Sequence, residues 1–455
     1  MSFQAINPAN GEAIATYSSA SLEEARTALQ RCHTAYLTWA TLPTASRTAP
    51  LSDLARVLRD RARPLADLMS SEMGKPFAQS AAEVEKCASV CDYYAEHAES
   101  FLAPVMADTD ATRSYWMYRP LGVVLGIMPW NFPLWQAIRY AVPALTAGNG
   151  ALLKHAPNVP GCAAAMEDLF REAGYPEGLF VNVFAELDTT AALIDDPLVR
   201  GVSLTGSVGA GRAVAERAGR ALKPCVLELG GSDPSIVLED ADLELAVSSC
   251  VQGRLLNAGQ SCIAAKRFIV VDAVRADFEA MVLERMAATR MGDPMDPMSE
   301  MGPMARRDLR DGLHDQVTRS IAAGALLALG GVVPERAGWW YPPTLLTDVM
   351  PGTPAHDEEM FGPVAAIVPV RDEAEAIRVA NQTNFGLGAS IYTRDVARGE
   401  RLAADAIEAG NCFVNGMVKS DPRLPFGGIK DSGFGRELSP LGILEFTNVK
   451  TVWVR

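Results

Sequence analysis

The sequence lacks most of the features that mark nucleic-acid-binding and membrane proteins. It has no block of Lys and Arg, and its 41 basic residues are outnumbered by 55 acidic ones, which gives a net charge of −14. A surface of that sign repels phosphate backbones, so nucleic-acid binding is not expected. The longest apolar runs, at 121–130 and 321–333, are shorter than the roughly 20 residues that span a bilayer. No charged segment followed by an apolar core begins the sequence, so we expect a cytoplasmic protein without a membrane partner.

Histidine and closely spaced cysteine are also scarce. The 455 residues include 5 histidines and 8 cysteines, and the cysteines form no Cys-x-x-Cys pair. No spacing of His and Cys matches a structural zinc site, so no metal is expected. In a long chain without a secretory signal, most cysteines should be reduced and buried. A reactive cysteine must therefore be recognised from its immediate neighbours.

The pattern of elements indicates an α/β protein with two lobes. The first hundred residues are predicted to be helical, with a helix start at Ser21 and Glu24 three residues later. From Tyr115 onward, short apolar runs bounded by Gly and Pro alternate with helical patterns, and a second such stretch begins near Pro234. This alternation favours parallel sheets with crossover helices. Ligands in such folds bind in a cleft at the carboxyl ends of the strands.

Two short segments could supply a covalent nucleophile and a general base. Cys262 follows a Gly-Gln-Ser turn, whose small residues leave a thiol accessible and backbone N–H groups free, as a nucleophile needs. The alternative is a buried structural cysteine. Glu228 ends a Val-Leu run and precedes two glycines, which suits a general base that activates water. The alternative is a solvated glutamate in a loop.

Two further polar residues follow predicted strands. Asn131 stands before a predicted helix, where its amide could stabilise an oxyanion or, equally, cap the helix. Lys154 lies at the carboxyl end of a strand, where ligands bind, although a surface lysine explains it as well.

Glycine-rich and aromatic turns provide weaker signals. The segment 205–212 opens a helix and could hold phosphates, but it is neither a Walker A loop nor GxGxxG in register. Glu359 and Phe361 share a Gly/Pro turn that could bind a ribose and stack on a ring, and Phe426 lies beside another flexible turn.

Taken together and in this order, the motifs resemble the NAD(P)-dependent aldehyde dehydrogenase superfamily over nearly the whole chain. The most specific are Pro-Trp-Asn-Phe-Pro at 129–133, Leu-Glu-Leu-Gly-Gly at 227–231, Gly-Gln-Ser-Cys at 259–262, Glu-Met-Phe-Gly-Pro at 359–363 and Pro-Phe-Gly-Gly at 425–428. The resemblance implies a Rossmann-like cofactor domain, an α/β catalytic domain and a β oligomerisation element in a homodimer or homotetramer. The implied bounds are 1–102 and 122–230, then 231–430, and finally 103–121 with 440–455.

The resemblance also implies a role for each catalytic candidate. Cys262 would attack an aldehyde to form a thiohemiacetal, and Asn131 with the Cys262 backbone N–H would hold its oxyanion. Glu228 would activate the water that releases the acid from a thioester. Relatives that transfer the acyl group to coenzyme A generally lack this glutamate, so hydrolysis is favoured.

The implied cofactor is NAD or NADP. The residues that the resemblance assigns to it are Trp130, Lys154, Pro157, Gly206, Ser207, Gly211, Glu359 and Phe361. Pro157 stands where NAD-preferring relatives often have a glutamate that repels a 2′-phosphate, so NADP should be tolerated. His155 would add favourable charge if it were protonated. The preference between the two cofactors stays open.

Segments around Lys154 and at 415–423 resemble bacterial succinate-semialdehyde dehydrogenases. A dicarboxylic semialdehyde needs a cation for its distal carboxylate, and arginine suits that role. Arg139 is the implied ligand, with Ser420 or Arg423 assisting and Phe426 at the substrate entrance. The alternatives are a structural role for Arg139 with broader activity on glutarate semialdehyde or aliphatic aldehydes, and a non-catalytic relative.

Overall fold

The computed structural model describes residues 2–455 and begins with an antiparallel hairpin. Strands β1 (Ser2–Ile6) and β2 (Ala13–Ser18) pair with each other, so the prediction of helix from the first residue onward is wrong for this segment. The side chains of β2 are exposed or half-buried throughout, so the strand has no continuous apolar face that would reveal it in the sequence. The helices that follow are α1 (Leu22–Trp39), α2 (Thr44–Asp60), α3 (Ala62–Met73) and α4 (Phe77–Phe101).

The start of α1 confirms the predicted helix cap. The Ser21 hydroxyl accepts from the Glu24 backbone N–H at 3.2 Å, and the Glu24 carboxylate accepts from the Ser21 N–H at 2.7 Å. This reciprocal pair satisfies two N–H groups that the first turn of a helix leaves free.

The first lobe is built on a six-stranded sheet in the order β19-β9-β8-β5-β6-β7, parallel except for β19. Its strands are β5 (Val123–Met128), β6 (Gly150–His155), β7 (Phe180–Asn182), β8 (Val199–Thr205), β9 (Cys225–Glu228) and β19 (Gly433–Phe434). The crossover helices are α5 (Pro133–Thr146), α6 (Pro160–Glu172), α7 (Leu187–Asp195) and α8 (Val208–Arg220). The carboxyl ends of these strands therefore deliver Asn131, Lys154, Gly206 and Glu228 to one edge.

The second lobe contains a seven-stranded sheet in the order β12-β13-β14-β11-β10-β16-β17, with only β12 antiparallel. Its strands are β10 (Asp233–Val237), β11 (Ala265–Val271), β12 (Leu326–Leu329), β13 (Thr344–Thr347), β14 (Val364–Val370), β16 (Gly388–Tyr392) and β17 (Asn411–Val414). Its helices are α9 (Leu243–Leu255), the 3₁₀ turn η1 (Leu256–Gly259), α10 (Asp272–Ala287), α11 (Arg307–Ala322), α12 (Pro354–Asp357), α13 (Glu373–Asn381) and α14 (Val396–Asp405). A short pair, β15 (Phe385–Gly386) with β18 (Ile429–Lys430), and α15 (Ser439–Leu444) complete the fold.

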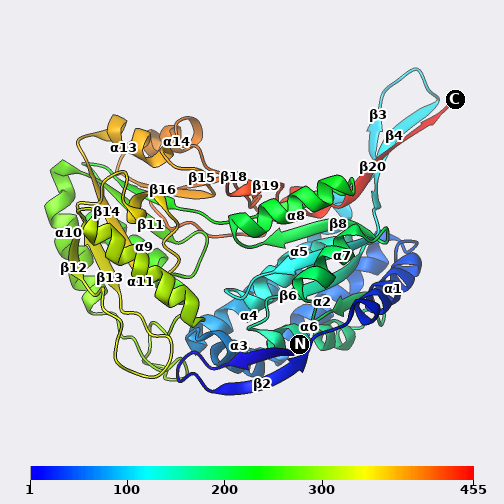
Figure 1. Ribbon diagram of the computed structural model, residues 1–455. Helices are drawn as coiled ribbons and strands as arrows, with labels where there is room; N and C mark the ends of the chain where they lie inside the picture. Colours follow the sequence, from blue (N-terminus) through cyan, green and yellow to red (C-terminus); the bar gives the residue numbers. More distant parts are fainter. Residues whose placement is uncertain (1) are drawn as a thin grey trace.

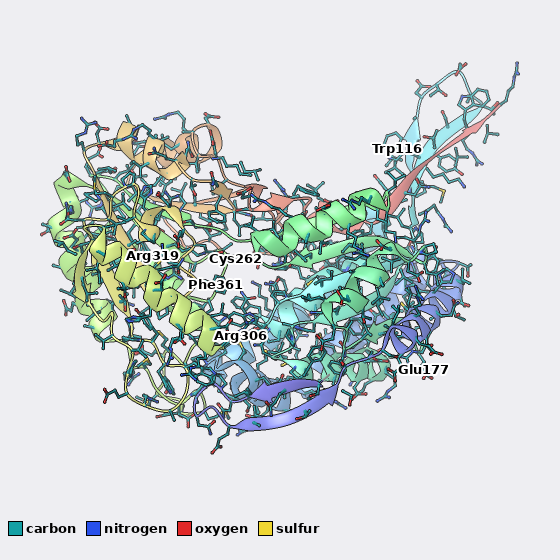
Figure 2. All side chains as sticks on the ribbon, viewed as in Figure 1. Trp116, Glu177, Cys262, Arg306, Arg319 and Phe361 are labelled. Carbon is teal, nitrogen blue, oxygen red and sulfur yellow. The ribbon has the colours of Figure 1, made fainter. Side chains whose placement is uncertain are left out.

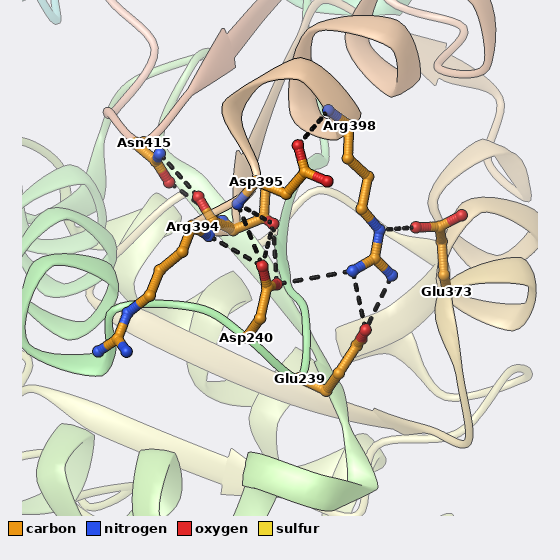
Figure 3. Close-up of polar contacts among 8 residues, drawn as sticks. Glu239, Asp240, Glu373, Arg394, Asp395, Arg398 and Asn415 are labelled. Carbon is orange, nitrogen blue, oxygen red and sulfur yellow. Dashed lines mark hydrogen bonds and ion pairs between the residues drawn. The ribbon is translucent and has the colours of Figure 1, made fainter.

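Charged side chains bind α14 to the rest of the second lobe (Figure 3). The Arg398 guanidinium donates to Glu239 at 2.8 Å and pairs with Glu373 at the start of α13. Asp240 accepts from the Thr393 hydroxyl at 2.8 Å. These contacts join α13 and α14 to the loops that follow β10 and β16.

The two lobes share apolar packing where they meet. The largest cluster of buried apolar residues lies mainly in the first lobe but also includes Ala305, Leu387 and Phe426 from the second. The two lobes that border the cleft are therefore packed directly against each other.

A three-stranded antiparallel sheet projects from the rest of the molecule (Figure 1). It consists of β3 (Val105–Ala107), β4 (Arg113–Pro120) and β20 (Thr447–Val454), with β4 in the centre and the labelled Trp116 on it (Figure 2). Within residues 2–455, none of the helices has the length and apolar character needed to span a bilayer.

Candidate active site

Cys262 lies on a loop whose backbone is held from several directions. The loop leaves α9 through Asn257 and Ala258, both in the left-handed region at φ 55° and 53°, and runs into β11. Lys266 Nζ donates to the carbonyl oxygens of Ser261 at 2.9 Å and Cys262 at 2.6 Å. The buried ammonium of Lys266 therefore holds the two backbone carbonyls that flank the Cys262 α-carbon.

The Cys262 thiol rests in its protonated form. Burial raises its pKa to about 12, the positive charge of Lys266 works in the opposite direction, and the negative charge of Glu228 adds to the rise. Figure 2 shows Cys262 and Phe361 between the two lobes. Only the thiolate attacks a carbonyl efficiently, so a reaction at this sulfur needs a proton acceptor.

The Asn131 side chain points toward the nucleophile loop. Its Nδ2 donates to the Gln260 carbonyl at 3.0 Å, and its own backbone carbonyl accepts from Asn257 Nδ2 at 2.8 Å. The alternative role as a helix cap is wrong, because Phe132 occupies the cap position of α5. The carboxylate of Glu83 accepts from two backbone N–H groups in the first turn of that helix at 2.9 and 3.0 Å.

Glu228 is a buried carboxyl group without a hydrogen-bond partner. Neither of its carboxylate oxygens is hydrogen-bonded within the described chain, and its side chain lies against Gly427, where a Cβ would come within 2.7 Å of Oε1. Burial raises the pKa of Glu228 well above its usual range, and the neighbouring negative charge of Glu437 raises it further. Arg139 and Arg436 oppose the shift. The alternative of a solvated loop glutamate is therefore wrong.

Lys154 and its neighbours occupy the carboxyl end of β6. Lys154 is half-buried, makes no ion pair within the part of the chain described, and has its pKa lowered by burial. Pro157 is exposed in the turn that follows. His155 is buried between the Pro133 carbonyl, 2.8 Å from Nε2, and the Ala156 N–H, which donates to Nδ1 at 2.8 Å. Burial lowers the His155 pKa to about 4, so the favourable charge considered for this residue is absent at neutral pH.

The start of α8 directs backbone N–H groups toward the cleft edge. Ser207 caps the helix by accepting from the Ala210 N–H at 3.3 Å, and Gly206 is hydrogen-bonded to the Glu228 carbonyl at 3.0 Å. Gly211 packs against Leu229, where a Cβ would approach to 2.5 Å, so this glycine lets α8 lie close to the sheet.

The turn at 359–363 approaches the same region from the second lobe. Glu359 accepts from the Gly231 N–H at 3.0 Å and lies 3.4 Å from Lys266 Nζ. The Phe361 and Trp130 rings meet edge-to-face, with 5.9 Å between their centroids. Glu359, Phe361 and Trp130, which were predicted from distant parts of the sequence, thus lie close to residues of the Cys262 loop and of the first lobe.

A cavity of about 180 Å³ has Cys262 in its wall. Its lining includes Cys262 and all three residues predicted to contact the substrate, Arg139, Ser420 and Phe426. It also includes Lys86 of α4, which the sequence analysis missed because nothing around it in its helix marks it as functional. Drug-sized ligands occupy pockets of about 300–1,000 Å³, so a cavity of this size suits a smaller molecule.

The cations around the cavity differ in their surroundings. Arg139 is buried, forms an ion pair with Glu437, and lies 4.8 Å from the centre of the Phe426 ring. Lys86 Nζ donates to Ser420 Oγ at 2.6 Å. Arg423 is exposed and already paired with Asp421, which disfavours its assistance in binding a substrate.

The comparisons with known proteins agree with this architecture. Residues 1–452 match the aldehyde dehydrogenase family. The chain is 48% identical over 448 residues to a protein of Escherichia coli (strain K12) named succinate semialdehyde dehydrogenase [NAD(P)+] Sad, covering 98% of this chain and 97% of that one. It is 47% identical over 457 residues, and all of both chains, to succinate-semialdehyde dehydrogenase [NADP(+)] 1 of Mycobacterium tuberculosis (strain ATCC 25618 / H37Rv).

A solved structure shows the same fold. The succinic semialdehyde dehydrogenase of Streptococcus pyogenes in complex with NADP+ superposes with a TM-score of 0.97 at 37% identity, over 99% of both chains. The fold and the motifs therefore define an α/β enzyme of two lobes. The chain belongs to the aldehyde dehydrogenase family.

Proposed function

We propose that the protein oxidises succinate semialdehyde to succinate with NAD or NADP. Relatives that match the whole chain are named for this substrate, and their names give NAD(P)+ or NADP(+). The observation that carries the proposal is the small cavity at Cys262, whose wall includes positively charged Lys86 and Arg139. A cationic wall beside a nucleophile favours an aldehyde that has a carboxylate.

In the proposed mechanism, the Cys262 thiol loses its proton to solvent, and the resulting thiolate adds to the aldehyde carbon. The carbonyl oxygen becomes an oxyanion, which the Asn131 amide and the Cys262 backbone N–H stabilise. Asn131 suits this role because one N–H bond to Gln260 fixes its side chain while a second N–H remains on the same amide nitrogen. The contact also sets the position of Asn131 relative to the loop that holds the nucleophile.

The first lobe has groups that fit a dinucleotide. Lys154 is a half-buried cation without an ion-pair partner in the described residues, and the capped start of α8 offers N–H groups suited to phosphate. Glu359 and Phe361 of the second lobe, with Trp130 of the first, would hold the nicotinamide end. When bound, NAD(P)+ supplies the hydride acceptor.

Glu228 is the proposed base for hydrolysis. After oxidation the acyl group is a thioester on Cys262, and Glu228 takes a proton from the water that displaces the thiolate. Only the ionised form of Glu228 can take this proton, so its raised pKa predicts that acid release becomes faster as pH rises through that pKa.

The test is the rate of NAD(P)H formation with succinate semialdehyde, glutarate semialdehyde, hexanal and benzaldehyde. We expect kcat/KM to favour succinate semialdehyde by about tenfold or more, which corresponds to about 1.4 kcal/mol. Equal values for hexanal would contradict the proposed substrate.

A broader aldehyde dehydrogenase is the second candidate. It is favoured by the ion pair between Arg139 and Glu437, because the arginine predicted to bind the substrate carboxylate already has a buried carboxylate partner. The same panel separates the two candidates, since a broader enzyme would show comparable values for charged and uncharged aldehydes.

We further propose that the projecting sheet joins subunits into a homodimer or homotetramer. It leaves apolar side chains in solvent, with Met106 63% and Val449 60% accessible. Exposed strand edges tend to pair with another chain. Light scattering on the intact protein and on a Met106→Glu variant tests this, because a monomeric wild type would contradict it.

A further inference from the structure

Three cations border the cavity at Cys262, and they are not equivalent. Arg139 pairs with Glu437, and Lys419 is exposed at the mouth. Lys86 is half-buried in the wall, and across residues 2–455 no carboxylate oxygen comes within 4.0 Å of its Nζ. A cation removed from water without a counter-charge is costly. Among the described residues Lys419 also has no ion pair, but it is exposed to solvent, so Lys86 is the cation that is partly removed from water without a counter-charge.

The surroundings of Lys86 hold its ammonium in a fixed position. Nζ donates to Ser420 Oγ at 2.6 Å and lies 4.4 Å from the centre of the Trp135 ring. Ser420 is itself buried, with 8% of its surface accessible. An ammonium has three N–H bonds, and Ser420 uses one, so two remain for a ligand in the cavity.

We propose that Lys86 binds the distal carboxylate of the aldehyde substrate and thereby determines specificity. This inference rests on the proposed function and deepens it, because it moves the carboxylate contact from Arg139 to Lys86. Ser420 acts with it by orienting the ammonium. Arg139 instead positions the wall, since its guanidinium lies between Glu437 and the Phe426 ring.

The charges around Lys86 support an anion as the missing partner. Burial, together with the positive charge of Arg139, lowers the Lys86 pKa to about 8, against the opposing influence of Cys87, Glu83 and Asp421. A bound carboxylate would favour the charged form. As pH rises through this pKa, free enzyme loses the ammonium, so the KM for a carboxylate-bearing aldehyde should rise while that for an uncharged aldehyde should not.

The experiment compares succinate semialdehyde with butanal, its uncharged four-carbon counterpart, in wild type and three variants. Lys86→Met keeps the length and apolar packing of the side chain but removes its charge, and Lys86→Arg retains the charge. Lys419→Met removes the same charge from the exposed rim. We expect Lys86→Met to lower kcat/KM for succinate semialdehyde about tenfold to a hundredfold, mainly through KM, as the loss of one charge-assisted hydrogen bond does. Its kcat/KM for butanal should stay unchanged.

The controls make each outcome decisive. Lys86→Arg should recover most of the loss, and Lys419→Met should show a much smaller loss. Equal losses for both aldehydes, or equal losses in Lys86→Met and Lys419→Met, would overturn the assignment of Lys86. If wild type prefers succinate semialdehyde and Lys86→Met keeps that preference, only this inference fails. If wild type shows no preference, the proposed substrate fails and this inference with it.

Discussion

The loop that carries Cys262 and the edge of the six-stranded sheet are built in opposite ways. In the loop, Arg254 Nη2 donates to the Gly259 carbonyl at 2.6 Å, and Lys266 Nζ donates to the carbonyls of Ser261 and Cys262. At the sheet edge, Lys154 has no ion pair in the described residues and Ser207 at the start of α8 is exposed. The polar groups of the Cys262 loop are hydrogen-bonded within the protein, whereas Lys154 and Ser207 at the sheet edge remain accessible to a ligand.

The difference matches the separate tasks of the two regions. A nucleophile and its oxyanion donors act best when their positions are fixed before the substrate arrives. A cofactor that binds and leaves in each cycle needs donors and cations that the protein has not already satisfied. We therefore expect changes in the loop to affect turnover and changes at the sheet edge to affect cofactor binding.

Replacing the nucleophile should have the largest effect. Cys262→Ala removes the atom that forms the covalent intermediate, so aldehyde oxidation should fall by about a thousandfold or more. NAD(P)+ should still bind, because the sheet edge is untouched, and quenching of protein fluorescence measures this. Undiminished oxidation in the variant would refute the covalent mechanism.

Loss of the buried carboxyl group should rank second. Glu228→Gln should slow release of the acid by about a hundredfold to a thousandfold, as expected for a general base. Because the Glu228 pKa is raised and the ionised form is the base, wild-type kcat should fall as pH decreases through that raised pKa. The variant should lack this limb of the pH profile, and an unchanged limb would assign it to another group.

Replacing Lys266, which donates to two carbonyls of the Cys262 loop, tests whether turnover depends on the fixed position of that loop. Lys266→Met removes two hydrogen bonds to the loop, so kcat should fall about tenfold to a hundredfold through displacement of the reacting groups. It also removes a positive charge that favours the thiolate, so alkylation of Cys262 by iodoacetamide at fixed pH should slow down. A stability defect alone would leave that alkylation rate unchanged in the folded protein.

Replacing Lys154, at the edge of the six-stranded sheet, should have the smallest effect. Lys154→Met should raise the KM for NAD(P)+ about tenfold, the size of one charge-assisted hydrogen bond, while kcat changes little. Lys223→Met is the matched control, since Lys223 donates to the backbone carbonyls of Ile194 and Asp196 away from the cleft. A fall in kcat with an unchanged KM would contradict the division between the two regions.

Local sequence patterns predicted the parts of the fold that depend on local interactions. The cap of α1 follows from a serine and a glutamate three residues apart, and β6 follows from the apolar run that precedes Lys154. The hairpin at residues 2–18 was missed because β2 has no buried face, so its alternation is too weak to distinguish it from neighbouring helical sequence.

The chemistry of the site depended on contacts that the sequence does not display. Lys86 and Ser420 are 334 residues apart, so nothing near either residue indicates their hydrogen bond. The low pKa of His155 and the high pKa of Glu228 arise from burial, which is a property of the folded chain. The motifs identified candidate residues, but their roles, the domain boundaries and the cytoplasmic location stay predictions.

The central claim is that Cys262 holds the substrate as a thioester until Glu228 activates water. Glu228→Gln should allow the first step and retard the second, so the intermediate should accumulate. After brief incubation with succinate semialdehyde and NADP+, followed by acid quenching, mass spectrometry of the peptide containing Cys262 should show the added mass of one succinyl group. Formation of NADPH in the same sample with Cys262 unmodified at every time point would contradict the account.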